Sequence, residues 1–508
     1  MIDECLREDH PTMKYDRAAT TTDAPPGLSR RTLVGIAAAA VCGSALPLGA
    51  DAIAYQPPPN PLANGRPQPS ARRFRSKSVD AAVARMHRIL DRPGTARRLA
   101  TLFDNCYPNT LDTTVSVDTI GGRPDTFVIT GDIDAMWLRD SAAQVEPYLR
   151  FAAQDAPLRQ LIAGVVNRQT RCILIDPYAN AFNRGPTGSP WASDKTEMKP
   201  ELHERKFEVD SLCYAVRLAY AFWKATDDVG CFDADWRRAS HVIVDTLSVM
   251  QRKSGLGPYR FQRVTDRAHD TAPNDGYGAP TRPIGLIASL FRPSDDACIF
   301  PFLIPSNMMA VVALRQLAEM HQTIAGDAAF AASTRAFADE VDAAIKVHAI
   351  VDHPRHGRVY AFEVDGFGSR LLMDDANAPS LIAAPYLGYC NADDGVYRNT
   401  RAMLLSPDNP WYYSGSAADG IGSLHTATGY IWPLAIIMRG LTSTDEVEIE
   451  TTLRHLIATD GGTGFMHESF DKDDPTRFSR PWFAWANSLF GALVLKIMDE
   501  HPTVLRRL

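Results

Sequence analysis

The stretch FEVDSLCYAVRLAYAFWKAT, residues 207–226, decides the fold class of this chain. Its apolar side chains recur three and four positions apart, and this spacing places them on one face of an α-helix. The residues that share the spacing are Val209, Leu212, Cys213, Val216, Ala219, Tyr220 and Trp223. The segment is therefore predicted to be an amphipathic helix that packs against a core.

The same periodicity extends over most of the chain. It recurs near 79–103, 140–153, 157–174, 231–253, 306–323, 327–349, 424–441, 443–459 and 481–499, and in shorter segments at 378–389 and 394–403. Alternation typical of strands is scarce, with Thr126–Ile129 and Val359–Val364 as the main cases. No sequence repeat of about 34 residues appears, which disfavours a solenoid. The sequence predicts an all-α fold of about a dozen helices joined by long loops.

Composition and charge exclude several classes of protein. The chain has 508 residues, of which 45% are hydrophobic and 22% charged, and this composition excludes disordered, collagen-like and coiled-coil proteins. The formal net charge is −7 and the pI is about 6.0. Because binding to nucleic acid needs a basic excess, no nucleic-acid partner is expected. The length fits one large domain or two ordinary ones.

The first 52 residues have the pattern of an export signal. Paired arginines lie in Ser29–Val34, and the apolar run that follows, Val34–Val41, is far shorter than the roughly 20 residues that span a bilayer. Ala50–Ala52 supplies small residues at the positions that a signal peptidase reads. A buried N-terminal helix is the alternative, but the Pro-rich segment Gln56–Pro61 cannot continue a helix. Residues 1–52 are predicted to be a twin-arginine (Tat) signal peptide.

Domain boundaries and location follow from this reading. Residues 53–78 are predicted to be a Pro-rich, disordered linker, and residues 79–508 one folded domain. The twin-arginine translocase is the expected partner during export, and the product is expected in the periplasm or outside the cell. The long region before the arginines is either an extended leader or the result of a true start after Met1. No other segment reaches transmembrane length, so no membrane span is expected.

No metal or cofactor is expected from the sequence. Six of the eight cysteines follow residue 52, widely separated and without C-x-x-C, which indicates buried thiols rather than a zinc site or a disulfide framework. The chain has no H-E-x-x-H, G-x-S-x-G, Walker or G-x-G-x-x-G pattern. It also lacks a regular calcium loop.

The first of four notable loop clusters is GDIDAMWLRDS, residues 131–141. It combines Asp134, Trp137, Arg139 and Asp140 at the start of a predicted helix. An apolar ring beside a planar donor and carboxylate acceptors suits a pyranose, which has C–H faces and a ring of hydroxyls. Helix capping by Asp140 is the alternative, but capping does not account for Trp137 beside Arg139.

The second cluster is FRPSDDA, residues 291–297, which leads to IPSNM, residues 304–308. Two adjacent carboxylates, Asp295 and Asp296, repel each other, so one of them can have a raised pKa and donate a proton. A solvated turn is the alternative for a bare SDD sequence.

The third cluster is MDDAN, residues 373–377, with GIGSLHT, residues 420–426, and the fourth is GFMHES, residues 464–469, with RPWFAWAN, residues 480–487. Glu468 lies among Phe, Met and Trp residues of the fourth cluster. A His–Glu pair at the surface is the alternative, but a carboxylate in an apolar wall is a candidate catalytic group.

Together these motifs resemble glycoside hydrolase family 125, the metal-independent exo-α-1,6-mannosidases. The matching segments run in order from about residue 79 to 500. They are GDIDAMWLRDS (131–141), FEVDSLCY (207–214), FRPSDDA (291–297), IPSNMMAVVALR (304–315), EVDGFG (363–368), LLMDDAN (371–377), PYLGY (385–389), GFMHES (464–469) and RPWFAWANSLFG (480–491).

The resemblance implies an (α/α)6 toroid with long, partly β-containing loops at its mouth. It implies inverting hydrolysis of a terminal α-1,6-linked mannose without a metal, by an Asp general acid and a Glu general base. The base motif falls on Glu468, and the acid motif falls on the pair Asp295–Asp296. Asp295 is the favoured acid, and Asp296 is the alternative. The domain at 79–508 is then the catalytic domain.

A mannose-containing oligosaccharide or glycan is the expected partner, although the sequence does not identify the natural one. The residues predicted to bind the terminal mannose are Asp134, Trp137, Arg139, Asp140, Asn307, Asp375, Asn377, His425 and Trp482. Two alternatives have different functions: another (α/α)6 carbohydrate-active enzyme, such as a lyase, or a glycan-binding protein without catalysis. The acid-rich clusters disfavour a lyase, and the paired carboxylates disfavour a pure binding protein.

Overall fold

The computed structural model describes residues 65–508, so the predicted signal peptide and most of the linker lie outside the described residues. The described part belongs to one compact unit. Residues 65–78 differ from the expected disordered linker. Arg66 Nε donates to Asp112 Oδ2 over 2.6 Å and Arg66 Nη2 to Asp80 Oδ1 over 2.8 Å. These bonds fix the linker's last residues to the folded unit, which thus includes residues before 79.

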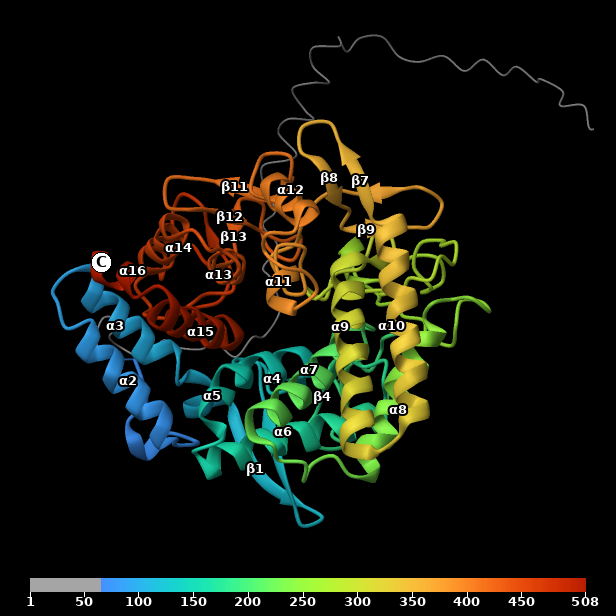
Figure 1. Ribbon diagram of the computed structural model, residues 1–508, viewed down its shortest axis with the longest axis horizontal. Helices are drawn as coiled ribbons and strands as arrows, with labels where there is room; N and C mark the ends of the chain where they lie inside the picture. Colours follow the sequence, from blue (N-terminus) through green and yellow to red (C-terminus); the bar gives the residue numbers. More distant parts are fainter. Residues whose placement is uncertain (1–64) are drawn as a thin grey trace, which may run out of the picture. The chain divides into compact units, whose positions relative to one another are not determined.

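Within residues 65–508, outer and inner helices alternate along the chain (Figure 1). The outer helices are α3 (Thr95–Cys106), α6 (Ala156–Ile175), α8 (Ala234–Val249), α10 (Ala328–His348), α12 (Gly395–Leu404) and α14 (Glu446–Ala458). Each is followed by an inner helix, namely α4 (Leu138–Val145), α7 (Val209–Thr226), α9 (Ile304–Met320), α11 (Ala384–Leu387), α13 (Pro433–Leu441) and α15 (Ala484–Glu500). The fold is an (α/α)6 toroid, as predicted.

Neighbouring inner helices contact one another around the toroid. α15 contacts α4, α4 contacts α7, α7 contacts α9, and α9 contacts α11, while α13 packs against α15. Every residue of α4 is buried, and α7 is buried over most of its length. The apolar spacing in residues 207–226 correctly predicted α7, because the side chains at that spacing face the core. The remaining helices are α2 (Lys77–Ile89), α5 (Leu149–Ala152) and α16 (Pro502–Arg507).

Short antiparallel strands fasten the loops between the helices. The three-stranded sheets are β3 (Met136–Trp137), β4 (Ala181–Phe182) and β5 (Leu202–Glu204), and β6 (Phe302–Leu303), β9 (Glu363–Val364) and β10 (Arg370–Leu371). The strand pairs are β1 (Val115–Ile120) with β2 (Arg123–Val128), β7 (Ile350–His353) with β8 (Gly357–Tyr360), β11 (Tyr412–Ser414) with β12 (Asp419–Ile421), and β13 (Tyr430–Ile431) with β14 (Phe470–Asp471). β3, β5, β6 and β13 each come shortly before an inner helix, so they fix the loops at the N-terminal ends of these helices.

Two predicted helices have different boundaries in the structure. The segment 79–103 forms two helices, because Pro93 and Gly94 interrupt it and Gly94 has a φ of 87°. The segment predicted as a helix at 424–441 becomes helical only from Pro433, which occupies the first position of α13. Its first residues form a loop and β13, and this loop carries His425.

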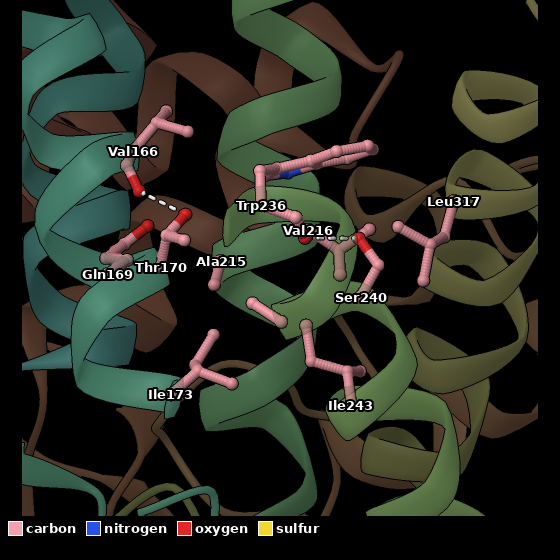
Figure 2. Close-up of a pocket in the computed structure, with 11 residues that line it drawn as sticks. Val166, Gln169, Thr170, Ile173, Ala215, Val216, Trp236, Ser240, Ile243 and Leu317 are labelled. Carbon is pink, nitrogen blue, oxygen red and sulfur yellow. Dashed lines mark hydrogen bonds between the residues drawn. The ribbon is translucent and has the colours of Figure 1, made fainter. Parts of the chain in front are cut away.

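Helices α6 to α9 pack closely against one another. Helices α6 to α9 enclose a cavity of about 20 Å³, lined mainly by apolar side chains such as Val216, Trp236 and Ile243 (Figure 2). A cavity of this size has room for one water molecule and none for a sugar. This cavity is therefore not a carbohydrate site.

Two further sequence expectations concern the described residues. None of the helices in residues 65–508 combines the length and the apolarity needed to cross a membrane. The cysteines at 106, 172, 213, 231, 298 and 390 are free, and all but Cys390 are buried.

The close contact between α15 and α3 gives a stability prediction. A Cβ atom at Gly491 would lie 2.2 Å from Tyr107 Cδ2. Tyr107 is buried, stacks on Phe103 at 5.0 Å, and donates from its hydroxyl to the Pro147 carbonyl at 3.2 Å, so its ring has little freedom to move. Gly491→Ala is expected to lower the free energy of unfolding by about 1–3 kcal/mol in chemical denaturation.

The matched control is Gly395→Ala, at the first residue of α12, where an added Cβ atom meets nothing within 4 Å. This variant should be as stable as the wild type or slightly more stable. Equal destabilisation by the two substitutions would contradict the packing described here.

Candidate active site

The N-terminal ends of the inner helices bring the four sequence clusters together, and Arg139 is at the centre of one group. Arg139 lies in the first turn of α4 and is buried. Its Nη1 donates to Glu208 Oε2 at 2.6 Å and to Asp210 Oδ2 at 3.2 Å, both at the start of α7. Its Nη2 donates to Asp295 Oδ1 at 3.4 Å, and its Nε lies 3.5 Å from Asp140 Oδ2. One guanidinium thus contacts four carboxyl groups.

The pKa values in this group diverge. Burial raises the pKa of Glu208 well above its ordinary value, even though the charge of Arg139 opposes that rise. Burial also acts to raise the pKa of Asp295, but the charge of Arg139 and the bond to Glu208 outweigh burial and lower it. The pKa of Asp140 rises to about 6, because burial outweighs the attraction of Arg139. Since one positive charge faces four acids, the group retains protons that separate carboxyls would lose.

Asp295 is the accessible acid of the SDD turn. Its side chain is 23% exposed, whereas that of Asp296 is 2% exposed. Asp295 has a φ of 66°, a left-handed conformation that costs energy for a residue with a Cβ and that the surrounding contacts must hold in place. Asn180 Nδ2 donates to Asp295 Oδ1 at 3.2 Å, and Lys206 Nζ donates to the Asp295 carbonyl at 2.8 Å. The surrounding structure therefore fixes both the backbone and the carboxylate of Asp295.

Asp296 is buried and holds the same turn in place through its contacts. Ser294 Oγ donates to its Oδ2 at 2.8 Å, while His425 Nδ1 and His269 Nε2 lie 3.4 and 3.8 Å from its Oδ1. Burial lowers the pKa of His425, but the charge of Asp296 and the bond to it reverse this and raise the pKa to about 9. His425 is therefore a cation at neutral pH.

A buried ion pair supports the SDD turn on the β6–β9–β10 sheet. Arg292 Nε donates to Glu363 Oε1 at 2.6 Å, and the other oxygen of Glu363 accepts from the backbone N–H groups of Ile299 and Phe300 at 3.0 and 2.9 Å. Both ends of the 292–300 segment are thus tied to one carboxylate on β9.

Glu468 lies on the loop before α15. Ser479 Oγ donates to Glu468 Oε2 at 2.7 Å, and Arg480 Nη1 lies 3.4 Å from its Oε1. Arg480 also pairs with Asp132 at 3.1 Å. These contacts hold the Glu468 carboxylate in one orientation beside a positive charge.

Glu468 and Asp295 share electrostatic partners, although they are 173 residues apart in the sequence. Burial lowers the pKa of His425, whereas the charges of Asp296, Glu468 and Asp295 raise it. The pKa of Arg480 is lowered by burial and raised more strongly by Glu468, Asp132, Asp140 and Asp295. Both carboxylates therefore act on the same two cations.

Aromatic residues wall the mouth beside Glu468. A Cβ at Gly131 would lie 3.0 Å from the Trp482 ring, and Gly131 has a φ of 132°. Glycine is therefore required at this position for Trp482 to lie against the first cluster. Trp137, on β3, is buried and meets the His203 ring edge-on at 5.3 Å.

Several predicted sugar-binding residues have other roles in the structure. The side chain of Asp134 is 72% exposed and pairs with Arg184 at 3.0 Å, at the outer surface of its loop. Asn307 is fully buried, and its amide bonds to the Ile287 N–H and carbonyl and to the Leu303 carbonyl. Because these bonds use the amide oxygen and both N–H groups of Asn307, that residue braces the backbone and has no donor left for a sugar.

Asp375 and Asn377 also brace a loop rather than line an open surface. Asp375 Oδ1 accepts from the N–H and the Nδ2 of Asn377 at 3.0 and 3.1 Å, and its Oδ2 accepts from Ser423 Oγ at 2.8 Å. Both residues are buried. Arg139 likewise orients acids, since its contacts are carboxylates. Asp140 is buried against Arg139, whereas the charges of both Asp295 and Glu468 act on His425, another of the predicted residues.

The sequence analysis missed other residues of the mouth, which are Asp132, Lys206, Glu208, Asp210, His269 and Arg480. A sequence argument could have found Glu208 and Asp210, because these two acids precede an apolar helical pattern and lie at the buried start of α7. Asp132 was passed over in favour of Asp134, and no spacing rule separates the two.

One group of possible metal ligands occurs in residues 65–508, and it is separate from these carboxylates. One side-chain atom each of His353, His356 and Asp408 lies within 4.8 Å of the other two, on the β7–β8 hairpin and after α12. Asp408 already pairs with Arg355 and accepts from His356 Nε2 at 2.8 Å.

An accessible Asp and an oriented Glu that act on the same cations are consistent with a glycoside hydrolase, which uses a pair of carboxyl groups. The family model for metal-independent α-mannosidases (GH125) matches residues 96–495. A solved α-mannosidase structure from Streptococcus pneumoniae, in a non-productive complex with α-1,6-mannobiose, is 45% identical with a TM-score of 0.80, and the match covers 84% of this chain and 99% of that one. This chain belongs to glycoside hydrolase family 125, the metal-independent α-mannosidases.

Two further proteins are similar. The meiotically up-regulated gene 157 protein of Schizosaccharomyces pombe is 41% identical over 463 residues, which cover 87% of this chain and 90% of that protein. A bacterial glucoamylase, solved with acarbose, is 13% identical with a TM-score of 0.50, and the match covers 80% of this chain and 57% of that one. At that identity the likeness shows the toroid fold alone.

The raised pKa of His425 predicts a pH-dependent stability. Protonated His425 is stabilised in the folded state, where its pKa is about 9, relative to 6.5 for an ordinary histidine. Its contribution to the free energy of unfolding is therefore fully present below about pH 6.5 and is lost as the pH rises through about 9. In calorimetry, the Tm difference between the wild type and His425→Gln should be larger at pH 6 than at pH 10. A Tm difference that does not vary with pH would contradict this account of the Asp296–His425 pair.

Proposed function

We propose that this α-mannosidase is an exo-acting, inverting enzyme that removes a non-reducing terminal α-1,6-linked mannose from an oligosaccharide or glycan. The observation that carries the proposal is the pairing of accessible Asp295 with oriented Glu468 at one mouth. The related Streptococcus pneumoniae protein was crystallised with α-1,6-mannobiose, which supports the linkage.

Asp295 is the proposed general acid, and its exposure favours it over Asp296. A donor must reach the glycosidic oxygen. The Asp295 carboxyl is partly exposed, whereas Asp296 is buried under Ser294, His269 and His425. Asp296 therefore holds the turn and fixes the His425 charge rather than donating to substrate.

Glu468 is the proposed general base. Arg480 Nη1 lies 3.4 Å from the Glu468 carboxylate, and the bond from Ser479 Oγ orients it. An ionised carboxylate of this kind can draw a proton from a water molecule. Inversion requires that water to lie between the base and the anomeric carbon, and the two carboxyls of inverting enzymes are about 6.5–9.5 Å apart.

The chemistry follows from these two roles. Asp295 delivers a proton to the glycosidic oxygen as the bond from that oxygen to the anomeric carbon breaks, and the bonding electrons stay with the oxygen. Water attacks the anomeric carbon from the opposite face and loses its proton to Glu468. Trp482 offers an apolar face to the mannose ring, and Asp132, Arg480 and His425 offer polar groups to its hydroxyls.

Synthetic mannobioses test the linkage and the stereochemistry together. We expect release of mannose from the α-1,6 isomer, with little or none from the α-1,2 and α-1,3 isomers. Proton NMR during the first turnovers should show β-mannose appearing before mutarotation, because attack from the opposite face inverts the anomeric centre. Release of α-mannose, or a preference for α-1,2, would refute the proposal.

Isosteric substitutions test the assignment of the two carboxylates. Glu468→Gln and Asp295→Asn should each lower kcat on α-1,6-mannobiose by about 100-fold or more, since each removes a proton-transfer group. Glu319→Gln is the matched surface control: Glu319 pairs with Lys224, and its side chain is 44% exposed. It should keep the wild-type rate.

Asp296→Asn gives the discriminating result for the acid. This substitution should lower the pKa of His425, while leaving more activity than Asp295→Asn. Greater loss in Asp296→Asn than in Asp295→Asn would make Asp296 the acid.

A further inference from the structure

Glu208, the N-cap residue of α7, is a buried acid for which the two-carboxylate mechanism has no use. Its side chain is 0% exposed. Oε2 accepts from Arg139 Nη1 at 2.6 Å and from Ser211 Oγ at 3.0 Å. Oε1 is also buried, and none of the N–H or O–H groups in residues 65–508 donates to it. A buried carboxylate oxygen without a donor is costly, so its surroundings need an explanation.

The carboxyl of Asp295 provides that explanation. The carboxyls of Glu208 and Asp295 both accept from the Arg139 guanidinium, Glu208 from Nη1 at 2.6 Å and Asp295 from Nη2 at 3.4 Å, so one planar group holds them near each other. Two ionised carboxylates have no donor between them, so a hydrogen bond between them requires a proton on one. A proton shared between Glu208 and Asp295 would account for the missing donor at Glu208 Oε1.

The charge balance of the group points the same way. Arg139 contacts Glu208, Asp210, Asp295 and Asp140, so four ionised acids would share one directly contacting cation in a buried group. Removing such charges from water is expensive. One proton retained by the group lowers that cost.

The surroundings decide which carboxyl holds the proton at rest. Asp295 is partly exposed and lies near the charges of Lys206 and His425, so ionisation costs it less. Of the ion pairs in the described chain, Glu208 takes part in one, with Arg139, and it is fully buried. The proton therefore rests on Glu208, and the negative charge rests on Asp295.

We propose that Glu208 stores the proton that Asp295 delivers to the leaving group. This inference rests on the proposed role of Asp295 as the general acid. Glu208 acts through Asp295 and does not touch the substrate. Glu208 lies at the start of α7, whereas Asp295 lies in the turn before α9. Two segments of the toroid therefore contribute residues to the delivery of the proton.

The proton balance of the step is as follows. The glycosidic oxygen takes a proton from the Asp295 carboxyl as its bond to the anomeric carbon breaks, and the Asp295 carboxyl takes one from Glu208. Glu208 is left ionised beside Arg139. After the product leaves, one proton from solvent enters through exposed Asp295 and returns to Glu208, while Glu468 releases to solvent the proton it took from water.

The test compares two substrates that differ in their need for an acid. The α-1,6-mannobiose leaving group must be protonated, whereas the phenolate of a dinitrophenyl α-mannoside leaves without a proton. Glu208→Gln keeps the shape of the side chain but has no proton to give. We expect it to lower kcat/KM on the mannobiose by about 100-fold or more and on the dinitrophenyl mannoside by less than about threefold. Equal loss on both substrates would overturn the proposal and leave Glu208 a packing role.

Control variants separate proton storage from folding. Ser211→Ala removes a neutral hydrogen bond to Glu208 and should change both rates little. Glu208→Asp retains a carboxyl and should recover part of the mannobiose activity lost in Glu208→Gln. If Glu208→Gln has a Tm well below that of the wild type, the activity of Glu208→Asp becomes the deciding measurement. The proposal is overturned if Glu208→Asp is folded but recovers none of the mannobiose activity.

The pH profile gives an independent reading. In Glu208→Gln the proton must be held by Asp295 alone, and Arg139 and Lys206 stabilise the ionised form of that residue. The alkaline limb of kcat/KM on the mannobiose should therefore move to lower pH, and an unmoved limb would contradict proton storage.

Asp295→Asn distinguishes the two proposals from each other. If Asp295→Asn also spares the dinitrophenyl mannoside while Glu208→Gln does not, Asp295 remains the acid and only the role of Glu208 fails. If Asp295→Asn impairs both substrates equally, the acid assignment itself fails.

Discussion

The contact of one buried guanidinium with four carboxyls is the interaction on which this active site depends. Arg139 comes from the start of α4, Glu208 and Asp210 from the start of α7, and Asp295 from the turn before α9. The three segments are distant in sequence, and a single planar group with several donors fixes all of them in register. Removal of the cation would leave buried charges without a partner, which typically costs about 3–5 kcal/mol. The proposed acid, Asp295, is therefore positioned by the same contact that joins neighbouring inner helices.

The toroid explains why so many acids can gather at one end. The loops that carry the site residues precede inner helices α4, α7, α9, α13 and α15, so the N-terminal ends of these helices meet at the mouth. Each helix N-terminus carries a partial positive charge, which stabilises nearby anions. The cations Lys206, His425 and Arg480 add full charges between the acids. A catalytic site that needs one protonated and one ionised carboxyl is thereby held within a stable scaffold.

The sequence predicted the scaffold better than the site. Helical periodicity depends on neighbours within a few turns, and it identified the inner and outer helices as well as the limits of α7 within two residues. It failed at residues 424–432, where a loop has apolar residues at helical spacing but the helix begins only at Pro433. Motif positions identified Asp295, Asp296 and Glu468, and the structure distinguishes the two aspartates by their exposure.

The contacts between the clusters could not be predicted from spacing. Asp132 forms an ion pair with Arg480, which is far from it in the sequence, whereas neighbouring Asp134 forms an ion pair with Arg184. Asn307 resembled a sugar ligand because it is polar and follows the SDD loop, but its amide is used entirely by backbone groups. The role proposed for Glu208 depends on Asp295, a residue of a different helical hairpin. Such pairings are set by tertiary packing, which one sequence without related sequences does not reveal.

The central claim is that Asp295 and Glu468 act from opposite sides of a terminal mannose. A crystal structure of Glu468→Gln with intact α-1,6-mannobiose tests it most directly. The account predicts that an Asp295 oxygen lies within hydrogen-bond reach of the glycosidic oxygen, about 2.6–3.2 Å. It also predicts a water molecule between residue 468 and the far face of the anomeric carbon. A glycosidic oxygen next to residue 468, or next to Asp296 with Asp295 remote from the bond, would contradict it.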